Sequence, residues 1–280
     1  MMQLWYDLIN LTHFEWTKYQ FMGNALLAVI IIAPVFGLLG TMTVSNKLAF
    51  FSDSLGHSTL TGIALGVLLG INNPVWSMIV FSLVFSYTIV MVKNFNRAST
   101  DTIIGVFAST AIALGLVILS RGGGFSKYST YFIGDLLGIA PSEILMLFLV
   151  LLAVVIIWIF IFNRLLVVSI NSTLARSRGI NTHLVEIIFT SVIAVIVALS
   201  IRWIGLLLIN SMLILPAAAA RNISRNVRQY HVLSVVFSLV SGIAGLIFSF
   251  YWDTASGATI ILAAADIFIL TLIIKLKFNI

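Results

Sequence analysis

One polar stretch interrupts a chain of apolar segments: Phe51-Ser52-Asp53-Ser54-Leu55-Gly56-His57-Ser58-Thr59-Leu60-Thr61-Gly62. If this stretch is helical, Asp53 and His57 are four residues apart and project from the same face, one turn from each other. A carboxylate oxygen and an imidazole nitrogen placed in this way can bind one divalent cation. Two ligands are too few for a closed site. We therefore expect a second copy of the chain to supply the other two around a shared two-fold axis.

A second interpretation of the same residues is helix capping. Ser52 and Asp53 are good N-cap residues, and a lone histidine in an apolar segment is commonly hydrogen-bonded to a neighbour. Ionisable groups inside a membrane are costly, however, and are therefore functional candidates. A helix that starts near Ser45 would place Asp53 about 12 Å inside it. A helix that starts at Ser54 would leave Asp53 at the rim as a cap.

The composition places the protein in a membrane. Hydrophobic residues make up 61% of the 280 residues and charged residues only 9%, against about 25% charged in a soluble domain. Apolar runs of about 20 residues can span a bilayer as helices. The sequence therefore predicts an all-α, polytopic protein with eight or nine spans. The nine candidates lie at about 21–42, 45–70, 75–92, 102–120, 143–163, 183–201, 203–220, 231–252 and 256–274.

The basic residues predict the orientation. If the N-terminus is outside and the C-terminus is cytoplasmic, most Lys and Arg residues fall in cytoplasmic loops, as the positive-inside rule requires. The rule also accounts for the net charge of +6, so no nucleic-acid partner is expected. The cytoplasmic set is Lys47, Lys93, Arg97, Arg164, Arg176, Arg178, Arg221, Arg225, Arg228, Lys275 and Lys277, against Lys18, Arg121, Lys127 and Arg202 outside. If either of the spans 183–201 and 203–220 fails to cross, this parity changes.

The remaining segments suggest no soluble domain, so we expect a single membrane domain over residues 1–280. Residues 1–20 are rich in aromatic side chains and are predicted to form an interfacial amphipathic segment. Residues 121–127 are predicted to form a flexible external turn. Residues 131–138 are too short to span the membrane and are predicted to form a re-entrant or surface helix.

A longer cytoplasmic loop runs from Asn171 to His183. Ser172 or Thr173 can cap a short helix in it, and Gly179 can end that helix in the left-handed conformation. The loop is either a basic segment attracted to anionic lipid headgroups or a docking helix for a cytosolic protein. The residues alone leave both interpretations open.

Three further aspartates lie within or next to the spans. Asp101 and Asp253 each precede a span and are expected to be N-caps. Asp266 lies in the middle of the last span, so its side chain must face another helix or water. It is a candidate for attracting cations in a transport pathway, and a hydrogen bond to a neighbouring helix is the alternative.

The missing motifs narrow the function. The chain has no Gly-x-x-x-x-Gly-Lys-Ser/Thr phosphate loop, no His-Glu-x-x-His and no Gly-x-Ser-x-Gly. It has no cysteine, which excludes disulfides and thiolate metal sites. We expect a transport subunit and not an enzyme. Such a subunit either takes energy from another subunit or moves its substrate down a gradient.

Short segments along nearly the whole chain occur in a familiar order. They are Gly37-Leu38-Leu39-Gly40, Ser52-Asp53 with Gly56-His57, 101–105 with Ala113-Leu114-Gly115, 131–137 with Gly134-Asp135, 175–180, 205–208, 213–217 with Ala220-Arg221, and Asp253 followed by 256–260. With these segments the chain resembles the membrane permeases of bacterial ABC importers for zinc, manganese or iron. One departure is at Ser54 and Leu55-Gly56, where that family often has Ala or Met.

The resemblance implies a homodimeric permease in the bacterial plasma membrane, with cytosolic ABC ATPase subunits and an extracytoplasmic metal-binding protein as partners. Asp53 and His57 would be metal ligands in the translocation path. The transported zinc, manganese or iron would be the substrate, with no permanently bound cofactor. The segment implied to couple to the ATPase is Leu174, Ala175, Arg176, Ser177, Arg178 and Gly179. An ATP-independent carrier or channel is the alternative, although the inverted repeat typical of many carriers is not evident.

Overall fold

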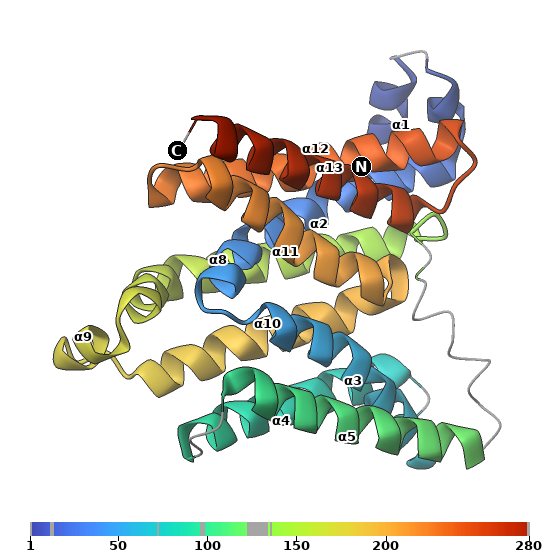
Figure 1. The fold of residues 1–280 in the computed structure, drawn as a ribbon. Coiled ribbons are helices and arrows are strands. Elements are labelled where there is room, and N and C mark those ends of the chain that lie inside the picture. The colour runs from blue at the N-terminus through green and yellow to red at the C-terminus, as the bar shows by residue number, and fades with distance from the viewer. Residues whose placement is uncertain are drawn as a thin grey trace. The chain divides into compact units, whose positions relative to one another are not determined.

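The computed structural model of this chain describes residues 2–11, 14–71, 73–95, 99–121, 134 and 136–278. Across those residues the regular secondary structure is helical, which confirms the predicted all-α class. Its long helices follow the order of the predicted spans (Figure 1). They are α2 (Gln20–Ser45), α3 (Ala49–Leu68), α4 (Pro74–Phe95), α5 (Thr100–Arg121), α8 (Pro141–Ile170), α10 (Thr182–Ile204), α11 (Leu206–Ile223), α12 (Val227–Tyr251) and α13 (Ser256–Phe278).

Seven of these helices are long and apolar enough to cross a membrane, judged on the described residues by length and composition. The two others are α3 and α11. Helix α3 has the length, but the Ser, Thr and Gly residues of the polar stretch lower its hydropathy. The apolar part of α11 is the shorter segment Leu208–Ile223. The predicted total of eight or nine spans agrees with this set of helices.

Helix α8 has 30 residues and extends beyond both ends of the predicted span 143–163. The polar pair Asn163-Arg164, where the prediction ended, lies inside the helix. At about 1.5 Å per residue this helix is about 45 Å long, against about 30 Å for the hydrocarbon core of a bilayer. Polar residues can continue a helix without penalty once it has left the hydrocarbon.

The chain divides into two compact units that alternate along the sequence. The first unit comprises residues 1–44, 134–155 and 203–280, and the second comprises residues 45–133 and 156–202. Helices α8 and α10 each pass from one unit into the other. The expectation of a single membrane domain stays a prediction.

In the first unit, α2 and α12 approach each other through small residues. The Ser234 hydroxyl donates to the Gly37 carbonyl (2.7 Å), and the Ser238 hydroxyl donates to the Ala33 carbonyl (2.8 Å). A Cβ added at Gly37 would lie 2.7 Å from the Val235 Cα. Glycine and serine therefore let the two backbones come close, and the serines satisfy backbone carbonyls where no water is present.

In the second unit, α3 packs against both α4 and α5, and Figure 1 shows the three helices side by side. A Cβ added at Gly62 of α3 would lie 2.9 Å from the Met78 Cα of α4. The Thr61 hydroxyl donates to the Ala111 carbonyl of α5, opposite Gly115. Most of α3 is buried, and Asp53 and His57 are among its few partly exposed residues.

The N-terminal segment contains α1 (Met2–Asn10) and a 3-10 helix, η1 (Glu15–Lys18). The Trp5 indole donates to the Gly23 carbonyl (2.9 Å), and the Tyr6 hydroxyl donates to the Asn24 amide oxygen (2.5 Å). Polar tips of the aromatic residues therefore attach α1 to the start of α2. The predicted interfacial position of residues 1–20 stays a prediction.

Both predicted aspartate caps are wrong. At the start of α5, the Ser99 hydroxyl oxygen accepts from the Thr102 N–H (3.2 Å), and Asp101 lies inside the first turn. Asp253 has φ 49° in the turn before α13, which begins only at Ser256. Only Arg121 of the turn 121–127 lies within the described residues. In the segment 131–138, residues 134 and 136–138 are described and are not helical, whereas 131–133 and 135 lie outside the described residues, so the predicted helix is not found in the described part.

We predict that Gly62→Ala destabilises the second unit. The new Cβ would lie 2.9 Å from the Met78 Cα and 3.1 Å from the Phe81 Cβ, closer than such atoms normally come. Overpacking of this kind costs about 1–3 kcal/mol. The expected result is a lower midpoint of thermal unfolding for the purified protein in detergent.

Gly105→Ala in α5 is the matched control, because its Cβ would meet only the Phe50 ring, at 3.8 Å. Alanine favours a helix over glycine by roughly 0.5–1 kcal/mol, so this midpoint should hold or rise. Equal losses in the two variants would contradict the close approach of α3 and α4.

Candidate functional site

Helix α3, which carries the polar stretch, begins at Ala49. Neither start considered from the sequence, Ser45 or Ser54, is right. Lys47 has φ 57° in the turn that follows α2, and this left-handed residue separates the two helices. Asp53 therefore lies about 6 Å along the axis from the first helical residue. It is inside the helix, at about half the depth expected for the earlier start.

Capping does not explain the polar residues at the start of α3. The N-cap position is Leu48, which makes no side-chain cap bond. The Ser52 hydroxyl instead donates to the Ala49 carbonyl (2.8 Å), three residues back. Asp53 is one turn further on than a cap. Asp53 is therefore not the N-cap of α3.

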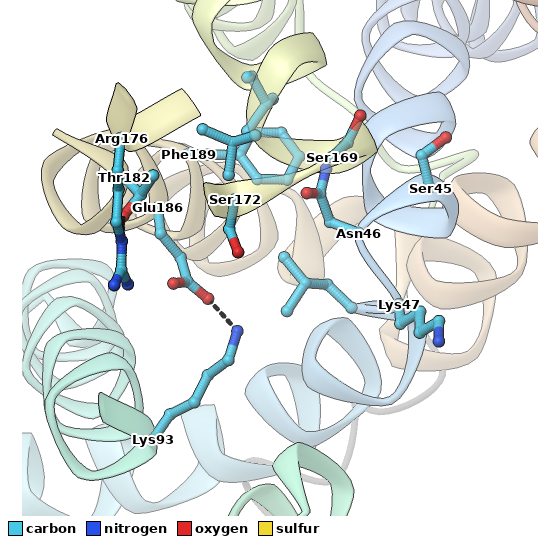
Figure 2. Close-up of a pocket in the computed structure, with 13 residues that line it drawn as sticks. Ser45, Asn46, Lys47, Lys93, Ser169, Ser172, Arg176, Thr182, Glu186 and Phe189 are labelled. Carbon is cyan, nitrogen blue, oxygen red and sulfur yellow. Dashed lines mark hydrogen bonds and ion pairs between the residues drawn. The ribbon is translucent and has the colours of Figure 1, made fainter. Parts of the chain in front are cut away.

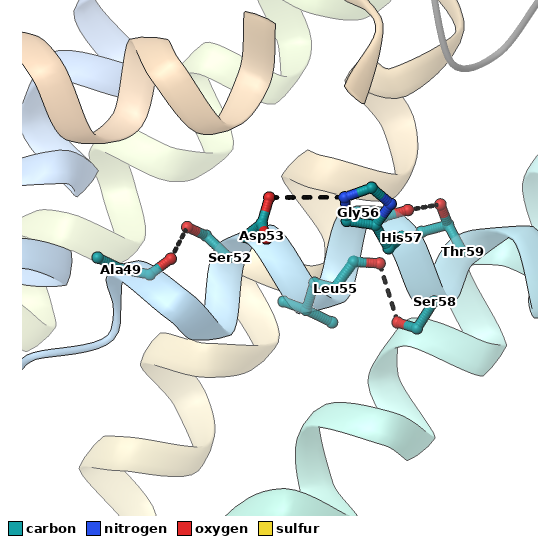
Figure 3. Close-up of polar contacts among 8 residues, drawn as sticks. All are labelled: Ala49, Ser52, Asp53, Leu55, Gly56, His57, Ser58 and Thr59. Carbon is teal, nitrogen blue, oxygen red and sulfur yellow. Dashed lines mark hydrogen bonds and ion pairs between the residues drawn. The ribbon is translucent and has the colours of Figure 1, made fainter. Parts of the chain in front are cut away.

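Asp53 and His57 lie on the same side of α3, as their spacing predicts. The Oδ1 of Asp53 is 3.8 Å from the Nε2 of His57 (Figure 3). Two ligands about 2.1 Å from a tetrahedral ion are about 3.4 Å apart. A small side-chain adjustment would therefore let both atoms reach one ion.

The two side chains are open while the residues around them are buried. The Asp53 side chain is 35% exposed and that of His57 is 40% exposed. Ser54, Leu55 and Ser58 are buried, and Figure 3 shows Leu55 and Ser58 on the opposite side of the helix. The pair is thus accessible to an ion at the N-terminal half of α3, whereas Leu60 and Ala64, one and two turns further along the same face, are buried against Leu119 of α5.

A single chain provides only part of a metal site. Among the residues that the structure describes, no three His, Asp or Glu side chains come together as a ligand group. Asp266 is exposed on α13 in the first unit, and no hydrogen bond to it is found within the described chain. The alternative of a hydrogen bond to a neighbouring helix therefore has no support here. Its role in a cation pathway stays a prediction.

The loop after α8 contains α9 (Ser172–Ser177), capped by Asn171. The Asn171 side-chain oxygen accepts from the N–H groups of Thr173 (2.9 Å) and Leu174 (3.1 Å). The predicted caps, Ser172 and Thr173, are therefore wrong by one or two residues. Asn171, Ser172 and Thr173 are all good N-cap residues, so the sequence does not decide which of them caps α9. In the structure the cap is Asn171.

The other end of α9 confirms the prediction for Gly179. This residue has φ 75° and its N–H donates to the Arg176 carbonyl (3.0 Å), while the Ile180 N–H donates to the Ala175 carbonyl (3.0 Å). Such a pair of bonds is a Schellman motif. Ala175 is buried, whereas Leu174, Arg176 and the C-cap residue Arg178 are exposed. The short helix therefore offers an apolar side chain followed by two positive charges.

A polar cavity of about 310 Å³ lies beside α9 in the second unit. Figure 2 shows the ion pair between Lys93 of α4 and Glu186 of α10 at its wall. Lys93 is expected in a cytoplasmic loop, and nothing in the sequence indicates Glu186 as its partner. Contact between residues this far apart in the chain leaves no local signal. The cavity lining comprises Ser45, Asn46, Lys47, Leu48, Lys93, Leu165, Val168, Ser169, Ser172, Arg176, Thr182, Glu186 and Phe189.

Long apolar helices around an open carboxylate and imidazole pair define a multi-pass membrane protein with a candidate cation site. The model of the ABC 3 transport family matches residues 18–275. The chain therefore belongs to the ABC 3 transport family, whose members are membrane permeases of ABC transporters.

Curated relatives span almost the same length. The chain is 31% identical over 255 residues to the high-affinity zinc uptake system membrane protein ZnuB of Haemophilus influenzae, covering 91% of this chain and 97% of that protein. It is 26% identical over 265 residues to the manganese transport system membrane protein MntC of Halalkalibacterium halodurans, covering 93% and 90%. Among solved structures, PsaBC from Streptococcus pneumoniae in complex with Fab matches with a TM-score of 0.78 at 24% identity, covering 97% and 95% of the two chains. This last likeness supports the fold.

We predict that Asn171→Ala loosens α9. The substitution removes both cap bonds, at a cost of about 1 kcal/mol. Hydrogen–deuterium exchange of the amides in residues 173–177 should speed up roughly fivefold, the factor that corresponds to that free energy.

Ser172→Ala is the control, since Ser172 was the cap expected from the sequence and makes no such bond in the structure. Its exchange pattern should match that of the unmodified chain. Faster exchange in this variant and not in Asn171→Ala would overturn the assignment of the cap.

Proposed function

We propose that this chain is the transmembrane permease of an ATP-driven importer that moves a divalent transition metal ion, zinc or manganese, into the cytoplasm. The observation that carries the proposal is the Asp53 and His57 pair, open on α3 with its two ligand atoms 3.8 Å apart. Membership of the ABC 3 transport family supports the ATP-driven mode. It disfavours the secondary carrier or channel.

The ligand chemistry and the relatives agree on the class of ion. Imidazole nitrogen suits zinc, and carboxylate oxygen suits manganese as well, so a mixed set accepts either. The relatives named for zinc and manganese uptake are similar to this chain over most of its length. Iron remains within the same ligand chemistry. In each case the ion is the substrate, and the chain holds no permanent cofactor.

A second copy of the chain completes the site in this proposal. Two Asp53 carboxylates and two His57 imidazoles would surround one ion on the dimer axis. Because each copy contributes two of the four ligands from its α3, the site opens when the two α3 helices move apart. Binding is then transient, which transport requires because an ion held too tightly would not leave.

The energy and the direction come from partners. The chain lacks a phosphate loop, so separate cytosolic ATPase subunits hydrolyse ATP. We propose α9, in which exposed Leu174 is followed by the basic residues Arg176 and Arg178, as the segment that docks on them. An extracytoplasmic binding protein delivers the ion, and the permease lies in the bacterial plasma membrane with its N-terminus outside. Alternating access then carries the ion past Asp53 and His57.

We predict that Asp53→Ala and His57→Ala each reduce accumulation of radiolabelled zinc or manganese by at least about tenfold in whole cells, as expected for the loss of a direct ligand. Assembly of the dimer with its ATPase should be unchanged in both variants. Asp101→Asn, which removes an exposed carboxylate of α5, should transport normally. Full uptake by either alanine variant would reject the site.

A cysteine variant tests the shared site, since the chain contains no cysteine of its own. His57→Cys should be crosslinked between two copies by a short bifunctional thiol reagent, because two histidines that share one ion have Cα atoms roughly 10 Å apart, beyond the reach of a direct disulfide. Ser58→Cys, on the buried side of α3, should stay monomeric on a denaturing gel. Crosslinking at position 58 in place of 57 would place the dimer axis elsewhere.

A further inference from the structure

We propose that the Lys93–Glu186 ion pair is the positioning contact that couples the docking segment α9 to the ligand-bearing helix α3. Movement of α9 would pass through α10 to Glu186, across the ion pair to α4, and from α4 to α3. This inference rests on the proposed function, since it assigns the pair a part in that transport cycle. Every contact it uses lies within the second unit.

The first step is a stiff joint between α9 and α10. The Schellman motif fixes the end of α9, and the Asn181 side chain accepts from the Leu184 N–H (3.0 Å) at the start of α10. The Arg176 Nε donates to the Thr182 hydroxyl (3.3 Å) across the connection. With both ends capped and a bond between them, a displacement of α9 carries the first turns of α10 with it.

The second step is the ion pair itself. Glu186 lies in the second turn of α10 and accepts a hydrogen bond from the Lys93 ammonium group near the end of α4. The two side chains are only 32% and 20% exposed. A hydrogen bond between charged groups is stronger than one between neutral groups, and separating a partly desolvated pair leaves each charge poorly solvated. The pair can therefore pull α4 when α10 moves.

The third step is the contact of α4 with α3. Gly62 and Gly66 of α3 face Met78 and Ser77 of α4, with no room for even one more carbon atom at Gly62. Surfaces packed this closely move together and do not slide. The side of α3 opposite this contact carries Asp53 and His57, so a shift of α4 would move the ligand atoms.

The cavity beside the pair provides room for the movement. It is bordered by the turn between α2 and α3, the end of α8, and residues of α9 and α10, and it is about 310 Å³ in volume (Figure 2). Lys93 and Glu186 lie at its wall. Helix α9 and the start of α10 can therefore shift at this point without first breaking a tightly packed apolar core.

A purely structural role makes a different prediction. Partly exposed ion pairs contribute little to stability, about 0–1 kcal/mol, and removing one for that reason alone would lower the unfolding midpoint slightly. It would not change how many ions are moved per ATP hydrolysed. The ratio of transport to hydrolysis therefore separates coupling from stabilisation.

The test uses the whole complex, with ATPase subunits and binding protein, in proteoliposomes. Ions accumulated per ATP hydrolysed are measured for Lys93→Gln, Glu186→Gln, Lys93→Arg, and the exchanged double variant Lys93→Glu with Glu186→Lys. Each Gln variant should lower the ratio by at least about fivefold, within the range of energies measured for interacting pairs. Lys93→Arg and the exchanged variant should each keep at least about half of the original ratio, because both retain an ion pair.

Lys277→Gln removes a lysine near the end of another helix, α13, and serves as the control with an unchanged ratio. The inference is overturned if the Gln variants keep the original ratio, with or without a lower unfolding midpoint, or if the exchanged variant is no better than the single ones. If the unmodified complex accumulates neither zinc nor manganese, the proposed function fails, and the inference fails with it. If the unmodified complex accumulates metal but the Gln variants keep its ratio of ions accumulated to ATP hydrolysed, this inference alone is refuted.

Discussion

The absence of water in the hydrocarbon of a bilayer is the constraint from which this structure follows. Polar groups there must find partners within the protein, and α3 meets that demand locally. The Ser58 hydroxyl donates to the Leu55 carbonyl (2.9 Å), and the Thr59 hydroxyl donates to the Gly56 carbonyl (2.5 Å). Hydroxyls satisfied in this way add little cost to an apolar helix. Asp53 and His57 are different, because ionisable groups cost more than hydroxyls to place within a membrane. Their presence on an open face points to a function beyond folding.

Much of the fold could be predicted because its signals are local. Apolar runs of sufficient length identify the helices. Gly179 identifies the end of α9, because glycine adopts the left-handed backbone conformation at less cost than other residues. The start of α3 could not be predicted, because it depends on Lys47 taking a left-handed conformation that its side chain does not favour. The choice of Asn171 over Ser172 as a cap involves residues of similar propensity. Small differences of this kind are decided by the surrounding structure.

In the candidate site too, features set by local sequence could be predicted and features set by the packing of separate helices could not. The spacing of Asp53 and His57 is a property of any helix, so their common face followed from the sequence once helicity was assumed. The partner of Glu186 was not foreseeable, since Lys93 is brought to it by the packing of separate helices. Asp266, by contrast, lies exposed on α13, and the hydrogen bond considered for it is not found among the described residues. A single charged residue in an apolar segment indicates that something must face it, but carries no information about what.

The length of α8 has a consequence for the segment that follows it. A helix of 30 residues projects about 42 Å along the membrane normal even when tilted by about 20°, which exceeds the hydrocarbon thickness by about 12 Å. If that excess lies at its C-terminal end, as the polar pair Asn163-Arg164 indicates, α8 acts as a stalk that raises α9 above the lipid headgroups. A cytosolic protein could then grip α9 from several sides without displacing any lipid.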